Sequence, residues 1–220
     1  MTQNRTMYRK EKFLESEIYH ICNKSISNFG IFTYPSNINR FIETLDFYNN
    51  VKSERKFSNA LRYKKYTFQS LISEKSNCLI KFLGYCIMPD HYHLLVKLLR
   101  SNFLSKYIGT VENSYTRYFD LKSSRRGPLW QSEFKCVLIQ SNEQLLHVSR
   151  YIHLNPVTNY LVNKPEDWEY SSYNDYMNKN ILKKYLTEIS IKSPKLYKKF
   201  VDNQINYQRK LKMIKKLILE

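Results

Sequence analysis

The sequence lacks both paired cysteines and long apolar runs. Its four cysteines are scattered and form no CxxC pair: Cys22, Cys78, Cys86 and Cys136. This spacing argues against a closed structural zinc site and against a disulfide scaffold. No apolar run approaches the roughly 20 residues of a membrane span, and the N-terminal MTQNRTMYRKEKF has no apolar stretch of a secretory signal after it. We therefore expect a cytoplasmic protein without a membrane-spanning segment.

Acidic residues are also scarce. There are 19 Asp and Glu against 36 Lys and Arg, which gives a net charge of +17. Such a field attracts a polyanion, and nucleic acid is the default candidate. The alternative is the codon bias of an AT-rich genome, which favours Lys, Asn, Ile and Tyr. The 42% hydrophobic content is enough for a real core in a chain of 220 residues.

The apolar pattern predicts strands alternating with helices. The expected strands are Ser16–Ser25, Leu79–Met88, His91–Leu99 and Gln131–Gln140, and the expected helices are Asn39–Asn50, Asn102–Leu121 and Ser141–Val157. The segment 57–73 reads as a helix running into a strand. Pro89-Asp90 indicates a turn between two adjacent antiparallel strands, and Pro156 is expected to end the last helix. This order predicts an α+β fold with a central antiparallel sheet flanked by helices.

The chain changes character near residue 178. Residues 178–220 contain eleven Lys and one Arg against three acidic residues, a net charge of +9 and more than half of the total. We expect a globular domain over residues 1–177 and a basic extension of one or two helices over residues 178–220. The extension could follow nucleic-acid phosphates, or it could be a solvated helical face.

Two histidines on a predicted strand form the first candidate site. His91 and His93 are at positions i and i+2, so both imidazoles point to one side of the sheet while Tyr92 points to the other. Two co-directed imidazoles can bind one divalent cation and leave positions open for water or phosphate. The alternative is a pair of half-buried histidines with no ligand, because a bare HxH is a weak motif.

A second candidate lies on the helix predicted over 141–157. Tyr151 and Asn155 are at i and i+4, so they share one helical face at the edge of its apolar stripe. A tyrosine in this position could present a nucleophile beside a metal ligand. It could equally be a core-edge aromatic, with Asn155 as a helix cap. Spacing alone does not single out Tyr151 among 19 tyrosines.

Four segments in series resemble one known family. They are YCIMPDHYHLLV (85–96), GPLWQSEFKCVLI (127–139), SRYIHLNPV (149–157) and EDWEYSSYNDY (166–176). In this order they look like the REP-associated tyrosine transposases, a branch of the HUH single-tyrosine transposases. The resemblance covers roughly residues 15–176. It implies an RRM-like or ferredoxin-like sandwich, in agreement with the predicted element order.

The resemblance also implies roles for particular residues. His91 and His93 match the HUH pair, with Tyr92 in place of the usual aliphatic residue between them. Tyr151 matches the nucleophile and Asn155 the third metal ligand. The implied activity is cleavage and rejoining of single-stranded, hairpin-forming DNA through a 5′-phosphotyrosine, with Mg²⁺ or Mn²⁺ as cofactor. Relatives act as monomers or homodimers.

Basic and aromatic residues near these segments are candidate DNA contacts. They are Arg125, Arg126, Trp130, Lys135 and Arg150. Trp130 could stack on an unpaired base, or it could pack beneath the strand that follows it. Two other functions remain open from sequence: a metal-dependent nuclease that uses water instead of tyrosine, and an RRM-like module that binds nucleic acid without cutting it.

Overall fold

A four-stranded antiparallel sheet forms the centre of the protein. The computed structural model describes residues 13–51, 56–63, 66–68, 70–73 and 76–219. The strands β1 (Ile18–Lys24), β2 (Ile80–Ile87), β3 (His91–Leu98) and β4 (Lys135–Leu138) lie in the order β2-β3-β1-β4. The predicted antiparallel pair around Pro89-Asp90 is confirmed by the β2–β3 ladder. The α+β class predicted from the sequence is therefore correct.

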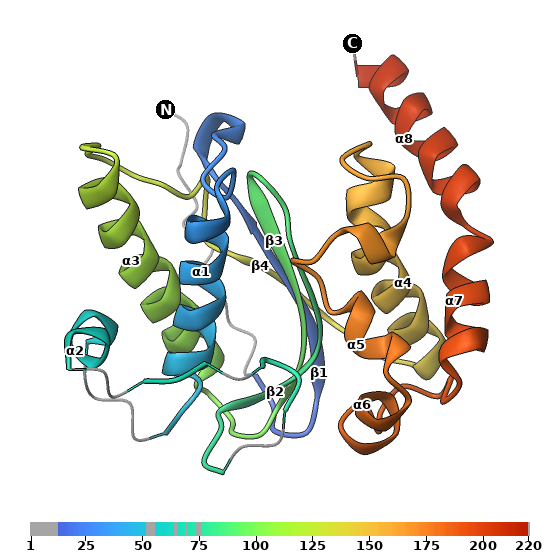
Figure 1. Cartoon of the computed structure of the whole chain (residues 1–220), viewed down its shortest axis with the longest axis horizontal. Helices are drawn as coiled ribbons and strands as arrows, with labels where there is room; N and C mark the ends of the chain where they lie inside the picture. Colours follow the sequence, from blue (N-terminus) through green and yellow to red (C-terminus); the bar gives the residue numbers. More distant parts are fainter. Residues whose placement is uncertain (1–12, 52–55, 64–65, 69, 74–75, 220) are drawn as a thin grey trace, which may run out of the picture.

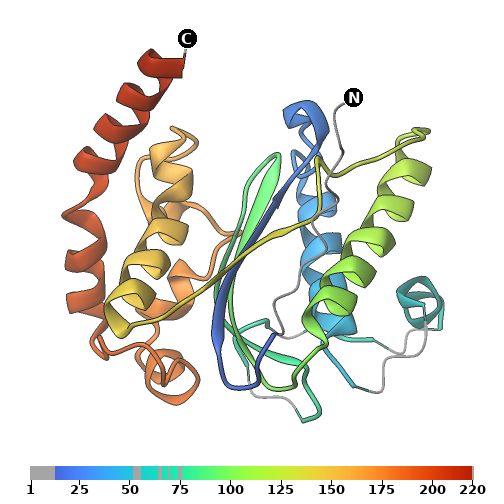
Figure 2. The same cartoon turned by 180° about the vertical axis from the view of Figure 1, so that it is seen from behind.

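Helices cover both faces of the sheet, as Figures 1 and 2 show from opposite sides. One face carries α1 (Pro35–Tyr48) and α3 (Leu104–Lys122), with α2 (Phe57–Arg62) outside them. The other face carries α4 (Asn142–Thr158). The remaining helices pack around α4: α5 (Tyr173–Met177), α6 (Lys179–Lys184), α7 (Pro194–Asp202) and α8 (Ile205–Leu219). Short 3-10 turns occur at Ile26–Asn28 and Pro165–Asp167.

The helix α3 shows why these residues form the layers. Its buried residues recur three or four positions apart and face the sheet: Leu104, Tyr107, Ile108, Val111, Glu112, Tyr115 and Phe119. This spacing is the apolar stripe that a helix buries against a sheet. The core therefore fills the space between the sheet and each helical layer.

The C-terminal helices share this core. Tyr197 and Val201 of α7 are buried, and the Tyr197 hydroxyl donates to Ser149 Oγ of α4 at 2.9 Å. Three helices occupy the described residues after 178, where the sequence predicted one or two. Among the described residues, none of the helices combines the length and apolar composition that crossing a bilayer requires.

Three local predictions were wrong. The expected strand at 131–140 is regular only over β4, because residues 131–134 leave the ladder between the Ser25–Trp130 bridge and the Cys22–Lys135 pair. The segment 57–73 forms α2 but no strand in its described residues. Pro156 does not end α4, which continues to Thr158. Pro156 removes one hydrogen bond of the helix, but the next turn still closes, since Asn159 N donates to Asn155 O at 3.0 Å.

Candidate active site

The two histidines of β3 face the α4 side of the sheet. Tyr92, between them, points to the opposite face, where its ring packs against Phe41 and Trp130 at centroid distances of 5.0 and 5.7 Å. The rings of His91 and His93 lie 5.1 Å apart. The alternation of a strand thus places both imidazoles on one face, as the sequence predicted.

Tyr151 lies directly over this pair. Its ring meets that of His93 edge to face at 5.4 Å, and Asn155 follows one turn later on the same face of α4. Tyr151 is 44% exposed, whereas Asn155 is buried. The helix α4 starts where expected, since Ser141 Oγ accepts from Gln144 N at 3.1 Å. The structure therefore brings a phenol that solvent can reach together with two histidines from a different element.

Each histidine of the pair is held through Nδ1. His91 Nδ1 contacts Asp90 Oδ1 at 2.6 Å, and His93 Nδ1 contacts His20 Nε2 at 3.0 Å. A metal-binding histidine usually donates its other ring N–H to a carboxylate or similar acceptor, which fixes the tautomer and the ring orientation. With the protons assigned to Nδ1, the Nε2 atoms of both rings are the donors for a metal.

Burial keeps His93 and its neighbour His20 neutral. Burial lowers the pKa of His93 well below its usual value, and His20 and His91 lower it further. Burial alone lowers the pKa of His20 to about 4. Burial opposes ionisation of Asp90, but the His91 hydrogen bond and Lys24 hold the Asp90 pKa below its usual value. Neutral imidazoles at His20 and His93, with the ionised Asp90 near them, form a charge state that can bind a cation.

The environment of Tyr151 works against its ionisation. Burial raises the pKa of the phenol, Cys22 adds to this effect, and the hydrogen bond from Asn155 lowers the pKa in part. The phenol is therefore protonated at neutral pH. It must lose its proton during an attack, and a nearby cation or basic group makes that loss easier.

A small cleft opens onto this arrangement. Its volume is about 230 Å³ and it is lined by Cys22, Asn23, Lys24, His91, His93, Gln131, Ser132, Lys135 and Tyr151. Lys135 is exposed at its rim and pairs with Cys22 across the β1–β4 ladder. Of the candidate DNA contacts, Lys135 is the one that lines the cleft of Tyr151.

The other candidate DNA contacts lie elsewhere. Trp130 packs on the α1/α3 face, where its Nε1 donates to Thr116 Oγ1 at 3.1 Å. Arg150, beside Tyr151 in sequence, is buried with its guanidinium 4.2 Å from the centre of the Phe200 ring of α7. Arg125 forms an ion pair with Asp120 at 3.0 Å, and Arg126 is exposed in the same loop.

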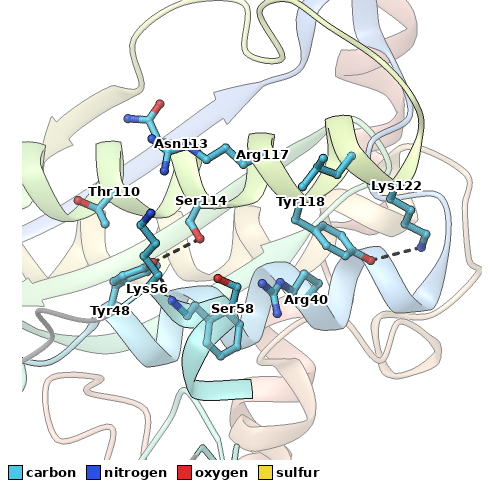
Figure 3. A pocket seen from close by; sticks show the side chains of 12 residues that line it. Arg40, Tyr48, Lys56, Ser58, Thr110, Asn113, Ser114, Arg117, Tyr118 and Lys122 are labelled. Atoms are coloured by element: carbon cyan, nitrogen blue, oxygen red, sulfur yellow. Dashed lines mark hydrogen bonds between the residues drawn. The ribbon is translucent and has the colours of Figure 1, made fainter. Parts of the chain in front are cut away.

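A larger hollow, of about 840 Å³, lies among α1, α2 and α3 on the opposite side of the sheet (Figure 3). Its cationic lining residues are Arg40, Lys56, Arg117 and Lys122. The Arg40 guanidinium lies 4.2 Å from the centre of the Phe57 ring. The described lining residues include no histidine, cysteine or carboxylate. This hollow can attract anions but lacks the groups for the chemistry of the Tyr151 cleft.

Sequence reasoning missed two side chains of the site, His20 and Cys22 on β1. Cys22 pairs with His93 in the β1–β3 register, so both point to the α4 face. Ligand atoms of His20, Cys22 and His93 all lie within 4.8 Å of one another. The available signal was the alternation of β1, which puts His20 and Cys22 on one face, but only the strand register shows what they meet.

A comparison with protein families matches the part of the chain that contains these residues. Residues 47–155, which include both histidines of β3, Tyr151 and Asn155, match the family model for IS200-like transposases. The match relates this stretch of the chain to the IS200-like transposases. This assignment agrees with the resemblance to REP-associated tyrosine transposases found in the sequence.

Individual relatives agree with this assignment. A Haemophilus influenzae protein named as a REP-associated tyrosine transposase is 31% identical over 102 residues, covering 41% of this chain and 57% of the relative. The chain thus matches little more than half the length of that relative. A solved REP-associated tyrosine transposase, bound to a REP hairpin, superposes with a TM-score of 0.54 at 15% identity, covering 79% of this chain and 84% of that one. At this identity the likeness concerns the fold.

Proposed function

We propose that this protein is an IS200-like transposase that cleaves and rejoins single-stranded DNA through a covalent link to Tyr151. The observation that carries the proposal is the position of Tyr151 against His93, with Nδ1 of both histidines already held. A nucleophile next to a cation site is what phosphoryl transfer requires. The hairpin bound by the structural relative favours a hairpin-forming substrate, and the need to reach DNA favours a cytoplasmic location.

The donor set fits a divalent metal. We assign His91 and His93, through Nε2, and the amide oxygen of Asn155 as its ligands, with the remaining positions for water and a phosphate oxygen. Asn155 Oδ1 accepts from Asn159 Nδ2 at 2.7 Å, which orients its amide. When bound, Mg²⁺ or Mn²⁺ supplies Lewis-acid polarisation of the scissile phosphate. Imidazole ligands suit Mn²⁺ somewhat better than Mg²⁺.

The chain's own residues carry the covalent step. The Tyr151 oxygen attacks phosphorus, the bond from phosphorus to the 3′ oxygen breaks, and the phenol proton passes to solvent while the departing 3′ oxygen gains a proton. The products are a 5′-phosphotyrosine and a free 3′-OH. Attack by another 3′-OH reverses the step, so no nucleotide cofactor is consumed. Lys135 at the cleft rim is placed to pair with a phosphate of the strand.

The test is covalent capture on a denaturing gel. The protein is incubated with end-labelled hairpin-forming single strands, taken from the DNA flanking its gene, in the presence of Mn²⁺. We expect a slow-migrating adduct that Tyr151→Phe abolishes. The matched control is Tyr34→Phe, an exposed tyrosine just before α1, which should leave the adduct intact. Cleavage that persists in Tyr151→Phe would show a hydrolytic nuclease instead, and binding without cleavage would show a non-catalytic module.

A further inference from the structure

His20, Cys22 and His93 form a second cluster of metal-binding side chains beneath Tyr151. They come from neighbouring strands, with Cys22 paired to His93 and His20 one pleat further along β1. Their ligand atoms all lie within 4.8 Å of one another. Only His93 belongs to the ligand set of the proposed function, so the other two side chains add a thiol and an imidazole that the cleavage reaction does not use.

The distances suit a small tetrahedral ion. His20 Nε2 and His93 Nδ1 face each other at 3.0 Å. In a tetrahedral zinc site with Zn–N bonds of about 2.0 Å, two ligand nitrogens are about 3.3 Å apart. An ion there would take the place of the proton that the two rings share, and both rings would turn so that the two nitrogens converge on it.

The cluster also has an entrance and an open position. Cys22 and His93 line the cleft of about 230 Å³ together with Tyr151, so an ion reaches them from solvent, and water or the phenol can complete the coordination. Burial raises the pKa of the Cys22 thiol, and Lys135 offsets part of this rise. Coordination releases the thiol proton to solvent.

We propose that His20, Cys22 and His93 bind Zn²⁺ or a similar thiophilic divalent ion, and that this binding inhibits the transposase. A thiolate with two imidazoles selects zinc over Mg²⁺ and Mn²⁺, which prefer oxygen. The inhibition rests on the proposed function, because a dication on Nδ1 of His93 repels a second one on Nε2 of the same ring. The two metal sites therefore exclude each other.

Cobalt spectroscopy tests the site without DNA. Co²⁺ substitutes for zinc, and a thiolate ligand produces a charge-transfer band in the near ultraviolet. The full chain should bind Co²⁺ with this band, and Zn²⁺ should displace it. Cys22→Ser should lose the band. Cys136→Ser is the matched control, because Cys136 lies on the other face of the sheet, beside Ile21, and it should keep the band. An unchanged band in a folded Cys22→Ser variant, or no band in the original chain, would overturn the site.

Inhibition is tested on the adduct. Zn²⁺ is titrated into the Mn²⁺-dependent reaction, and each variant is compared with its own zinc-free rate. We expect the inhibitory zinc concentration to rise at least about tenfold in Cys22→Ser, the lower end of what loss of even an outer partner of a metal costs. Equal sensitivity of both chains would refute the inhibitory role. If no adduct forms in any chain, the proposed function fails while the cobalt spectrum still decides the zinc site.

Discussion

At the scale of single residues, His20 fixes the ring orientation of His93 and decides which ring nitrogen is available to a cation. The contact of 3.0 Å between His20 Nε2 and His93 Nδ1 holds the ring of His93 and leaves Nε2 for the metal of the proposed site. Loss of such an outer partner typically weakens metal binding by about 10- to 100-fold. Asp90 holds the ring of His91 in the same way, through a contact of 2.6 Å between Asp90 Oδ1 and His91 Nδ1.

We therefore predict that His20→Leu weakens Mn²⁺ binding by about 10- to 100-fold, measured by titration of the free-ion EPR signal. His20→Gln, whose amide oxygen can still accept from His93, should recover part of the loss. His147→Leu serves as control, because His147 is more than half exposed and contacts Glu143 and Arg150 rather than the pair. Equal Mn²⁺ affinity in His20→Leu and the original chain would rule out this positioning role.

Residue patterns predicted the part of the site that depends on local geometry. The shared face of His91 and His93 follows from the period of a strand, and that of Tyr151 and Asn155 from the period of a helix. Their meeting required the family resemblance, because no local rule places α4 over β3. His20 and Cys22 escaped notice since their relation to His93 depends on the strand register.

At the scale of elements, a buried carboxylate ties α3 to the sheet. Glu112 Oε1 accepts from Asn23 Nδ2 of β1 and from the Tyr92 hydroxyl of β3, both at 2.7 Å. All three side chains are buried. The network joins a helix to two neighbouring strands on the face opposite Tyr151.

Glu112→Ala should lower the free energy of unfolding by about 2–4 kcal/mol, because it leaves buried donors of Asn23 and Tyr92 without their acceptor. Glu112→Gln keeps an acceptor oxygen and should cost less. Urea denaturation at pH 7 measures both values. A loss below about 0.5 kcal/mol in Glu112→Ala would mean that water replaces the carboxylate.

The short helix α5 contains an acid that is costly to ionise. Burial raises the pKa of Asp175 to about 6, above the usual value near 3.9 of an unfolded chain. Ionisation of Asp175 therefore lowers the free energy of unfolding. This penalty is complete above about pH 6, shrinks as the pH falls from about 6 to about 4, and is absent below about pH 4. Asp175→Asn should stabilise the protein by about 1–3 kcal/mol at pH 7.5, and the gain should vanish near pH 4. Denaturation at both pH values checks this, and a gain that is equal at both would contradict it.

Element boundaries were less predictable than element types. The strands β1, β2 and β3 and the helices α1, α3 and α4 lie within a few residues of their predicted positions, because their apolar periods are long and regular. β4 is shorter than predicted because its pairing with β1 breaks after Trp130. Propensity cannot reveal such an irregularity, which depends on the partner strand.

At the scale of the whole molecule, the net charge of +17 attracts polyanions such as the DNA of the proposed reaction. A polyanion binds such a chain with strong salt dependence, since each phosphate contact releases counterions. Most of this attraction depends on the total charge and not on where a particular lysine or arginine lies. Lys135 differs from the average lysine because it lines the cleft of Tyr151.

Lys135→Gln should weaken single-strand binding and flatten the plot of log affinity against log salt by about 0.7, the value for one lost phosphate contact. Lys106→Gln, an exposed lysine on the opposite helical layer, should leave the slope nearly unchanged. Fluorescence anisotropy at several salt concentrations measures both slopes. Equal slopes in the two variants would show that Lys135 acts only through net charge.

The contact between Tyr151 and His93 lies within one polypeptide, and this has a kinetic consequence. In the proposed reaction the nucleophile and the cation ligands come from one chain, so adduct formation per molecule should be independent of enzyme concentration. For the same reason, a mixture of Tyr151→Phe and His93→Ala chains has no route to an intact centre and should stay inactive. A chain with a defective site could then compete with an active chain for DNA, but two defective chains could not combine their side chains into one working site.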